Sequence, residues 1–464
     1  MVQLMVLLDV TVVNIALPRA QSALHFSSGN RQWIVTAYAL AFGSLLLLGG
    51  RLSDLWGRRN ALYVGLAGFA LASLLGGSAR SFTVLVVARA LQGVFGALLA
   101  PAALAALSVT FADAQERARA FAIYGLVGGA GAAIGLLLGG ALTQWASWRW
   151  CLFINVPLAA VALVGVALFV KSVRGEHHTR LDVPGTVLGS GGLFFVVFGL
   201  SHAVTSSWAN AATWGSLVVG VVLLVLFVGW QQRSKHPLLP LRILTSRTRA
   251  VSLIALLLTS MGLFAVFLLL AYYLEETLGY SPLRTGVAFV PLVLALALSS
   301  TSASARLLAK TGPRPLVPSG MLLAMMGMVL FTRLTPHSDY GGHVLPGLVV
   351  TGLGLGLILA PAIASATAQI EPRDAGAASA MVNTAQQIGV SFGTALLNTI
   401  AVTVTTRALA HAKGTLAHAH RSATVHGYSV AFWWSAGIFA VGALLTLFLL
   451  ESVSPNDAEL APAP

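Results

Sequence analysis

Charged residues are scarce in this sequence. Asp, Glu, Lys and Arg make up only 9% of its 464 residues, whereas a soluble globular chain carries about 25%. Acids are the scarcest, because 14 Asp and Glu stand against 27 Lys and Arg. With 57% hydrophobic residues and a mean hydropathy of +0.85, this composition excludes an ordinary soluble domain. It indicates a protein that crosses a membrane many times.

Several features of binding and catalytic proteins are also missing. The single Cys151 cannot form an intramolecular disulfide, and its apolar surroundings favour a packed thiol. No Gly-Lys-Ser or Gly-Lys-Thr follows the glycine runs, so ATP-driven transport is not expected. The histidines of the Ala-rich stretch 405–428 have no acid or cysteine among them, which favours a solvated loop over a metal site. We expect no cofactor, no metal and no enzyme activity.

Long apolar runs dominate the rest of the chain. A membrane-spanning helix needs about 20 apolar residues, and fourteen stretches meet that requirement. We therefore predict an all-α membrane protein. The predicted spans are 4–24, 32–50, 61–79, 82–107, 120–142, 151–171, 185–203, 212–231, 250–274, 285–304, 316–334, 344–363, 377–404 and 429–450.

The basic residues predict the orientation of these spans. An even number of spans places both termini on one side, and most Lys and Arg residues fall in loops on that same side. This is the bias of cytoplasmic loops, and it explains a pI near 10.7 without nucleic-acid binding. We expect both termini in the cytoplasm. The chain enters an apolar run without a basic leader, which is consistent with a truncated start and shows no cleavable signal peptide.

Two internal echoes predict the architecture. The segment Arg51 to Arg59 is echoed by Arg306 to Arg314, and Gly96 to Ala102 by Gly356 to Ala362. Each pair lies eight predicted spans apart, so the two copies share one orientation, as in parallel repeats. We predict a six-helix lobe at 1–171, linkers with two inserted helices at 172–249, a second six-helix lobe at 250–451 and a cytoplasmic tail at 452–464.

The loop after the second predicted span combines small and charged residues. Glycines allow a tight turn, and Asp54 is placed to pair with Arg58 at a helix boundary. We therefore predict a conformational latch; the alternative is a solvated basic turn. This loop resembles the signature loop of the major facilitator superfamily. The residues of the predicted latch are Gly50, Asp54, Gly57, Arg58 and Arg59.

Further segments resemble the fourteen-helix drug:proton antiporter family of that superfamily. The resemblance implies two six-helix lobes with two inserted helices and a multidrug exporter in the bacterial inner membrane, and we expect a monomer. It covers most of the chain but is not specific to a substrate. It is carried by Leu8, Asp9, Thr11, Asn14, Leu17 and Pro18, by segments 32–38 and 148–157, and by Gly279 to Pro282.

Two charged residues lie inside predicted spans. A carboxylate or guanidinium at membrane depth is costly and persists where it faces protein or water, so Asp9 is a candidate functional site. The resemblance implies that Arg89 takes part in proton transfer, with Asp9 as its partner. The alternatives are a structural ion pair for Asp9 and backbone carbonyls as partners of Arg89. Glu275, which closes the ninth span, is a weaker proton-coupling candidate and is equally a solvated helix end.

The fifth span carries small residues at four-residue spacing, which allow close helix approach. The candidates are Gly131, Gly135, Gly139 and Gly140. This span resembles the antiporter motif of exporters, with Leu136 in place of the motif's proline. That departure weakens the case for antiport over another transport mode.

The thirteenth span carries a polar stripe that faces a cavity or another helix. Polar contacts between helices are a strong alternative to a substrate cavity. The candidates for cavity residues are Tyr38, Phe95, Asn383, Gln386 and Gln387.

Together these features predict a proton-coupled exporter of amphipathic, cationic or aromatic small molecules. Its partners would be substrate, protons and the lipid bilayer. One rival is a dedicated metabolite exporter or another secondary transporter, which the substitution at Leu136 keeps open. A second rival is a membrane sensor or membrane enzyme, which no catalytic spacing of side chains supports.

Overall fold

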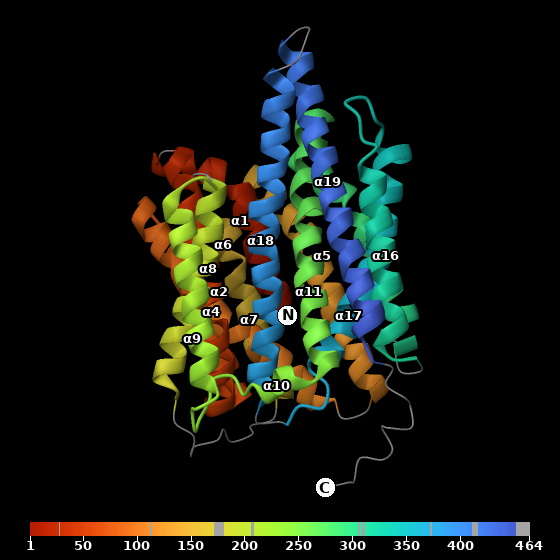
Figure 1. Ribbon diagram of the computed structural model, residues 1–464. Coiled ribbons are helices and arrows are strands. Elements are labelled where there is room, and N and C mark those ends of the chain that lie inside the picture. Colours follow the sequence, from red (N-terminus) through yellow and green to blue (C-terminus); the bar gives the residue numbers. More distant parts are fainter. Residues whose placement is uncertain are drawn as a thin grey trace. The chain divides into compact units, whose positions relative to one another are not determined.

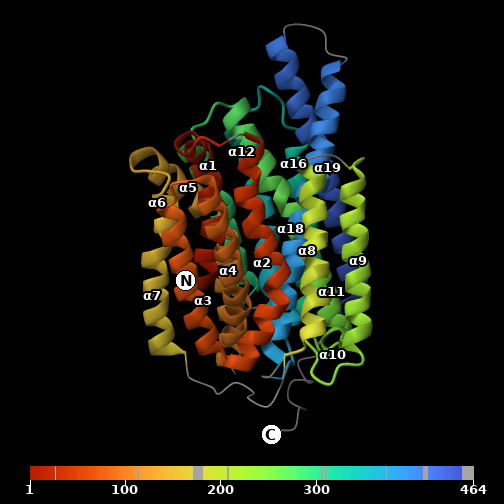
Figure 2. The same cartoon turned by 90° about the vertical axis from the view of Figure 1, so that its left-hand side faces the viewer.

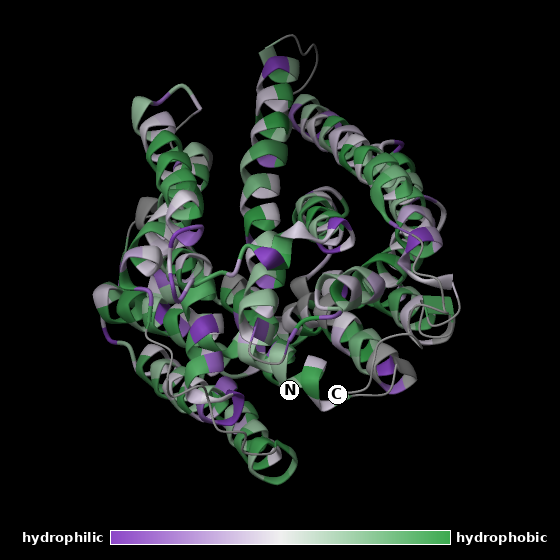
Figure 3. Ribbon diagram, turned by 60° about the horizontal axis from the view of Figure 1, so that its bottom comes forward, coloured by the Kyte–Doolittle hydropathy of each residue, from purple (hydrophilic) through white to green (hydrophobic). Residues whose placement is uncertain are grey.

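The computed structural model consists of helices in its described part, which comprises residues 1–26, 28–111, 114–170, 181–205, 208–304, 307–308, 311–371, 374–410 and 416–451. Hydrophobic residues cover most of the length of these helices (Figure 3). The chain runs as long helices joined by short connections (Figure 1). The first part contains α1 (Val2–Leu24), α2 (Ser28–Trp56), α3 (Arg58–Gly77), α4 (Phe82–Thr110), α5 (Ala114–Trp145), α6 (Trp150–Phe153), α7 (Asn155–Phe169), α8 (Val183–Thr205), α9 (Ala211–Gln231) and α10 (Arg242–Thr245).

The second part of the chain is interrupted more often, because π-helical turns separate its shorter helices. It contains α11 (Arg247–Phe264), η1 (Ala265–Leu269), α12 (Leu270–Tyr272), η2 (Tyr273–Thr277), α13 (Pro282–Ala288), α14 (Val290–Leu298), η3 (Ser299–Ser304), α16 (Pro313–Phe331), η4 (Tyr340–Val344), α17 (Leu345–Ala366), α18 (Ala375–Ala410) and α19 (Leu416–Leu449).

Twelve helices in the described part are long and apolar enough to cross a membrane. The predicted spans 4–24 and 120–142 are not among them, although they fall within α1 and α5. The count of fourteen is therefore not confirmed and stays a prediction. The twelve are Trp33–Trp56, Arg58–Gly77, Phe82–Thr110, Trp150–Phe169, Val183–Ala203, Ala211–Gln231, Arg247–Thr277, Leu283–Thr301, Pro313–Phe331, Tyr340–Ala366, Ala375–Ala410 and Ala419–Leu449.

The helices form two compact units. Unit 1 comprises Met1–Thr110, Ile134–Thr245 and Gln369–Thr384, and unit 2 comprises Phe111–Ala133, Ser246–Ala368 and Ala385–Pro464. The chain of both α5 and α18 is thus divided between the units. The predicted lobes at 1–171 and 250–451, the insert at 172–249 and the tail at 452–464 stay predictions.

Unit 1 packs its helices through glycines. On α2, a Cβ added to Gly49 would lie 2.1 Å from the carbonyl oxygen of Ala97, so α2 and α4 approach backbone to backbone. Within this unit α8 and α9 lie side by side (Figure 2). Two apolar clusters flank Asp9 on α1: Met5 packs with the first, and Leu8 and Val12 with the second. Asp9 is therefore held between apolar layers.

Unit 2 repeats local features of unit 1. Gly312 precedes α16 with φ of 69°, as Gly57 precedes α3 with φ of 80°. Both glycines adopt a left-handed backbone conformation, which costs other residues more. In α17, a Cβ on Gly356 would lie 2.7 Å from the carbonyl oxygen of Leu296, which brings α17 close to α14. The segments that echo each other in sequence thus carry matching turns and close helix contacts.

Candidate functional site

Asp9 and Arg89 form a buried ion pair in unit 1. The exposed fractions of their side chains are 0% and 1%, and Arg89 Nη1 donates to Asp9 Oδ2. The Nε–H of Arg89 donates to the carbonyl oxygen of Ile34 over 3.3 Å, and its guanidinium lies 4.5 Å from the centre of the Tyr38 ring. Two buried charges are tolerated when they pair and their remaining donors are satisfied. The pairing of Asp9 with Arg89 that the sequence suggested is present.

Two amides complete the environment of Asp9. Its Oδ1 accepts hydrogen bonds from Gln92 Nε2 at 2.9 Å and from Asn155 Nδ2 at 2.7 Å. Gln92 also accepts from Arg89 Nη1 at 2.7 Å and donates to Ser73 Oγ at 2.8 Å. This buried network therefore joins α1, α3, α4 and α7, and a proton added to Asp9 would alter contacts on all four helices.

Sequence reasoning missed Gln92, Asn155 and Ser73. Gln92 follows Arg89 by three residues and so shares its helix face, a signal that was available. Asn155 lies in the segment 148–157 used for the resemblance, but nothing in its position predicted a contact with α1. Ser73 carries no distinguishing sequence signal.

Two of the predicted latch residues, Gly50 and Asp54, meet the first turn of α18, whose residues up to Thr384 belong to unit 1. Asp54 is buried, and its Oδ1 and Oδ2 accept hydrogen bonds from the backbone N–H groups of Gly376 at 2.9 Å and Ala377 at 3.2 Å. A carboxylate is favourable there because the first N–H groups of a helix lack partners within the helix. Sequence reasoning named Arg58 as the partner of Asp54 and missed α18.

The glycines of the loop permit this contact. A Cβ on Gly50 would lie 2.5 Å from the carbonyl oxygen of Gly376, so neither backbone leaves room for a side chain. Gly57 provides the left-handed turn before α3. Arg59 Nη2 donates to the carbonyl oxygen of Ala167 on α7 at 3.2 Å.

A second charged contact lies at the same helix end. Asp374 directly precedes α18 and accepts a hydrogen bond from Arg242 of α10. Glu371 lies 3.8 Å from the same guanidinium. The Arg242 guanidinium thus contacts two acids of the stretch that directly precedes α18.

The glycine face of α5 touches α1. A Cβ on Gly135 would lie 1.7 Å from Thr11 Oγ1 and 3.4 Å from the carbonyl oxygen of Leu8. Gly139 and Gly140 are buried, and Gly131 is buried in the part of α5 that belongs to unit 2. The side chain of Leu136 lies outside the described residues. The close approach predicted for this face is present at Gly135, which contacts Thr11, two residues from Asp9 along α1.

The predicted cavity residues are divided between the two units. Tyr38 is buried and stacks on Phe42, with ring centres 5.5 Å apart. Phe95 is half-buried against α3, where Cβ atoms on Gly65 and Gly68 would meet α4. Asn383 is buried and donates to the carbonyl oxygen of Ser379 at 2.8 Å. It belongs to unit 1, whereas the half-buried Gln386 and Gln387 belong to unit 2. Their role in a substrate cavity stays a prediction.

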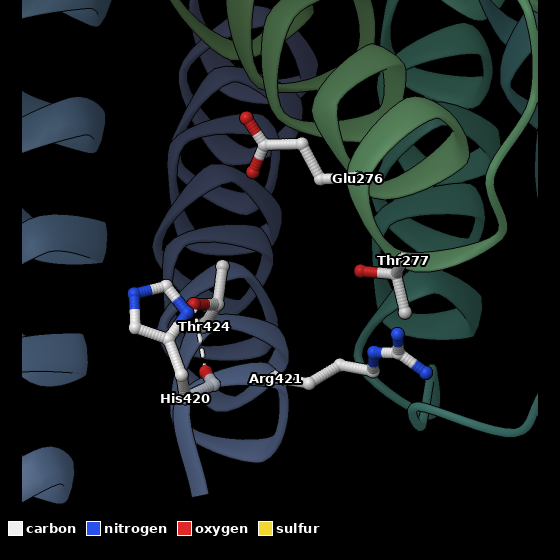
Figure 4. A pocket seen from close by; sticks show the side chains of 5 residues that line it. All are labelled: Glu276, Thr277, His420, Arg421 and Thr424. Carbon is white, nitrogen blue, oxygen red and sulfur yellow. Dashed lines mark hydrogen bonds between the residues drawn. The ribbon is translucent and has the colours of Figure 1, made fainter. Parts of the chain in front are cut away.

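The end of η2 in unit 2 carries Glu275, half-buried, and Glu276, exposed. Glu276 lines a pocket of about 270 Å³ with residues of η2 and α19, and the side chains surround the space between the two segments (Figure 4). The other lining residues are Thr277, His420, Arg421 and Thr424. Glu275, the weaker of the predicted proton-coupling candidates, is not among them.

Metal-binding groups of three or more His, Cys, Asp or Glu are absent from the part of the chain that the structure describes. His411 and the side chain of His418 lie outside that part, and His420 and His426 are exposed.

Comparisons with known proteins found a matching family, similar relatives and a solved structure of similar fold. The family described as "Major Facilitator Superfamily" matches residues 1–394. The "Puromycin resistance protein pur8" of Streptomyces alboniger is 48% identical over 97% of this chain and 90% of its own length. The "Cephamycin export protein CmcT" of Amycolatopsis lactamdurans is 36% identical over 85% and 82%. The crystal structure of the human organic anion transporter MFSD10 (TETRAN) has a TM-score of 0.62 at 18% identity and covers 96% of this chain and 97% of that chain.

Proposed function

The chain belongs to the major facilitator superfamily of membrane transporters, and on that premise we propose that it is a proton-coupled antiporter that exports amphipathic, cationic or aromatic small molecules. The observation that carries the proposal is the buried Asp9 network. Asp9 is the side chain that accepts and releases the proton, and Arg89 is its counter-charge. A buried carboxylate is a costly feature that membrane proteins retain for function.

The relatives support antibiotics as the class of substrate that this chain exports. Two of them are described by resistance to puromycin and by export of cephamycin. The two names give two different compounds, so they support a class of substrate rather than one compound. Because each of these two relatives is named for a single compound, the second candidate is an exporter dedicated to one metabolite.

Transport follows alternating access between two six-helix lobes, 1–171 and 250–451. The chain crosses the membrane in fourteen spans and has both termini in the cytoplasm. It acts as a monomer in the bacterial inner membrane. Asp54 and the amino-terminal end of α18 act as the latch of one state. Proton entry neutralises Asp9, and substrate competes with the proton for the same site. The membrane potential contributes about 2.3 kcal/mol per charge per 100 mV, which supports more than a tenfold substrate gradient.

The test is proton-driven efflux from right-side-out membrane vesicles, with ethidium and puromycin as probes. We expect Asp9→Asn to lower efflux at least about 100-fold, as loss of a group essential to turnover does, at an unchanged protein level. Glu451→Gln, which removes an exposed acid at the end of α19, is the matched control and retains wild-type efflux. Wild-type rates in Asp9→Asn, or efflux that persists after the proton gradient is collapsed, would contradict the proposal.

A further inference from the structure

We propose that Asn155 is the positioning residue that serves both protonation states of Asp9, as a donor to the carboxylate and an acceptor from the carboxylic acid. This inference rests on the proposed function, in which Asp9 binds and releases a proton. An amide is suited to the task because it carries a donor and an acceptor on one carbon.

Protonation of Asp9 creates a hydrogen-bonding problem. The carboxylate accepts three N–H groups, from Arg89 at Oδ2 and from Gln92 and Asn155 at Oδ1. A proton on either oxygen turns that oxygen into a donor. The acid then needs an acceptor in a region where Asp9 is 0% exposed, because a buried unpaired donor is unfavourable.

Both polar atoms of the Gln92 amide already make hydrogen bonds. Its Oε1 accepts from Arg89 at 2.7 Å, and its Nε2 donates to Asp9 and to Ser73 at 2.9 and 2.8 Å. Turning this amide would place its NH₂ group against the Arg89 guanidinium. The carbonyl oxygen of Ile34 is likewise occupied by Arg89 Nε. Neither oxygen is a good acceptor for a protonated Asp9.

Asn155 is not committed in this way. Its Nδ2 donates to Asp9 Oδ1 at 2.7 Å, while its Oδ1 is buried and has no hydrogen-bond partner among the described residues. Rotation of the amide by about 180° exchanges the two atoms and is broadly permitted for this terminal torsion. The unpartnered Oδ1 then faces the atom that carries the new proton. The Asn155 side chain therefore has an acceptor that is unpaired while Asp9 is charged and that can accept from Asp9 when it is protonated.

The other described groups near Asp9 offer one competing acceptor for its proton, the hydroxyl of Tyr38. Arg89 is the charged neighbour and only donates. The Cys151 thiol interacts with Thr143 Oγ1 at 3.2 Å. The Tyr38 hydroxyl is buried and has no partner in the described part, so it is the competing acceptor. A Cβ on Gly96 would lie 3.4 Å from that hydroxyl, which places it one helical turn beyond Gln92 along α4.

The first test compares proton-driven efflux with substrate counterflow, using ethidium or puromycin, whichever the wild type exports. Counterflow exchanges substrate without a proton cycle. Asn155→Leu removes both bonds, and we expect proton-driven efflux to fall about tenfold, the worth of one hydrogen bond to a charged group. Counterflow should stay within about twofold of the wild-type rate, because it does not require Asp9 to change its protonation state. Asn155→Ser, whose hydroxyl donates and accepts, restores most of the efflux.

The pH profile adds a readout that a packing role would not move. The lost donor stabilised the charged form more than the lost acceptor stabilised the neutral form, so half-maximal efflux in Asn155→Leu moves upward by about one pH unit. Tyr38→Phe, which removes only the competing hydroxyl, keeps the pH of half-maximal efflux, whatever its effect on the efflux rate. An unchanged profile in Asn155→Leu, an equal loss of counterflow and efflux, or the same shift in Tyr38→Phe would overturn the assignment.

Infrared difference spectra taken on acidification observe the bond directly. The carbonyl band of protonated Asp9 is identified by its absence in Asp9→Asn, and we expect it at higher wavenumber in Asn155→Leu because the acid has lost its acceptor. An unmoved band overturns the role of Asn155 while the antiport proposal stands. No Asp9 band at any pH, or wild-type efflux that ignores the proton gradient, refutes the antiport proposal and removes the basis of this inference.

Discussion

The hydrogen bonds of Asp54 give the most quantitative prediction. Asp54→Ala removes the carboxylate that accepts from the N–H groups of Gly376 and Ala377 at 2.9 and 3.2 Å. Hydrogen bonds to a charged group contribute about 1.5–3 kcal/mol each. Because paired contributions are not fully additive, we expect a loss of about 2–4 kcal/mol from the state in which the loop contacts α18.

This loss corresponds to a shift of about 30- to 1000-fold in the equilibrium between that state and one in which the loop leaves α18. The assay is the distance distribution between spin labels at Asn60 and Gln369, both exposed, in a Cys151→Ser background. Wild type should show mainly one short distance, and Asp54→Ala mainly a longer one. Asp54→Asn, which keeps one acceptor oxygen but not the charge, should lie between them.

Two further variants serve as the positive and the negative control for this measurement. Gly50→Val adds side-chain atoms where even a Cβ would lie 2.5 Å from the Gly376 carbonyl oxygen, so it should populate the long distance with Asp54 intact. Glu451→Gln removes an exposed acid elsewhere and should leave the distances unchanged. If Asp54→Ala keeps the wild-type distribution, the two hydrogen bonds do not hold this state and the latch proposal is wrong.

Two other perturbations test the packing and the pH dependence. Gly135→Val should separate α5 from α1, because a Cβ there would lie 1.7 Å from Thr11 Oγ1, and lower coupled efflux at least about tenfold; Gly165→Val, with open space around it, should not. Burial raises the pKa of Asp182, but hydrogen bonds from Gly185, Trp230 and Gln231 outweigh it and hold the pKa below its ordinary 3.8. The stabilisation it provides is therefore present above pH 3.8 and lost as the pH falls through the folded-state pKa. Thermal unfolding between pH 7 and pH 2 should accordingly show a smaller pH dependence in Asp182→Asn than in wild type, and parallel curves would argue against this network.

Much of the local structure was predictable because it depends on neighbouring residues. Apolar runs of membrane length became helices, and the positions of Gly57 and Gly312 before α3 and α16 follow from the internal echo. The need for Asp9 and Arg89 to find partners also follows from sequence, since neither charge is tolerated alone in an apolar span. The family was likewise recognised from its motifs, whereas the count of fourteen spans rests on apolar length alone and is not confirmed.

The identities of distant partners were decided by tertiary packing. Asn155 lies 146 residues from Asp9, and Gly376 lies 322 residues from Asp54. The sequence indicates that a buried carboxylate needs donors, but which helix supplies them depends on how helices pack and which faces meet. The sequence by itself determined that Asp9 needs partners, and it named only Arg58 as a partner of Asp54. The fold decided that Asn155 contacts Asp9 and that the first turn of α18 contacts Asp54, because hydrogen bonds require atoms within about 3 Å of each other.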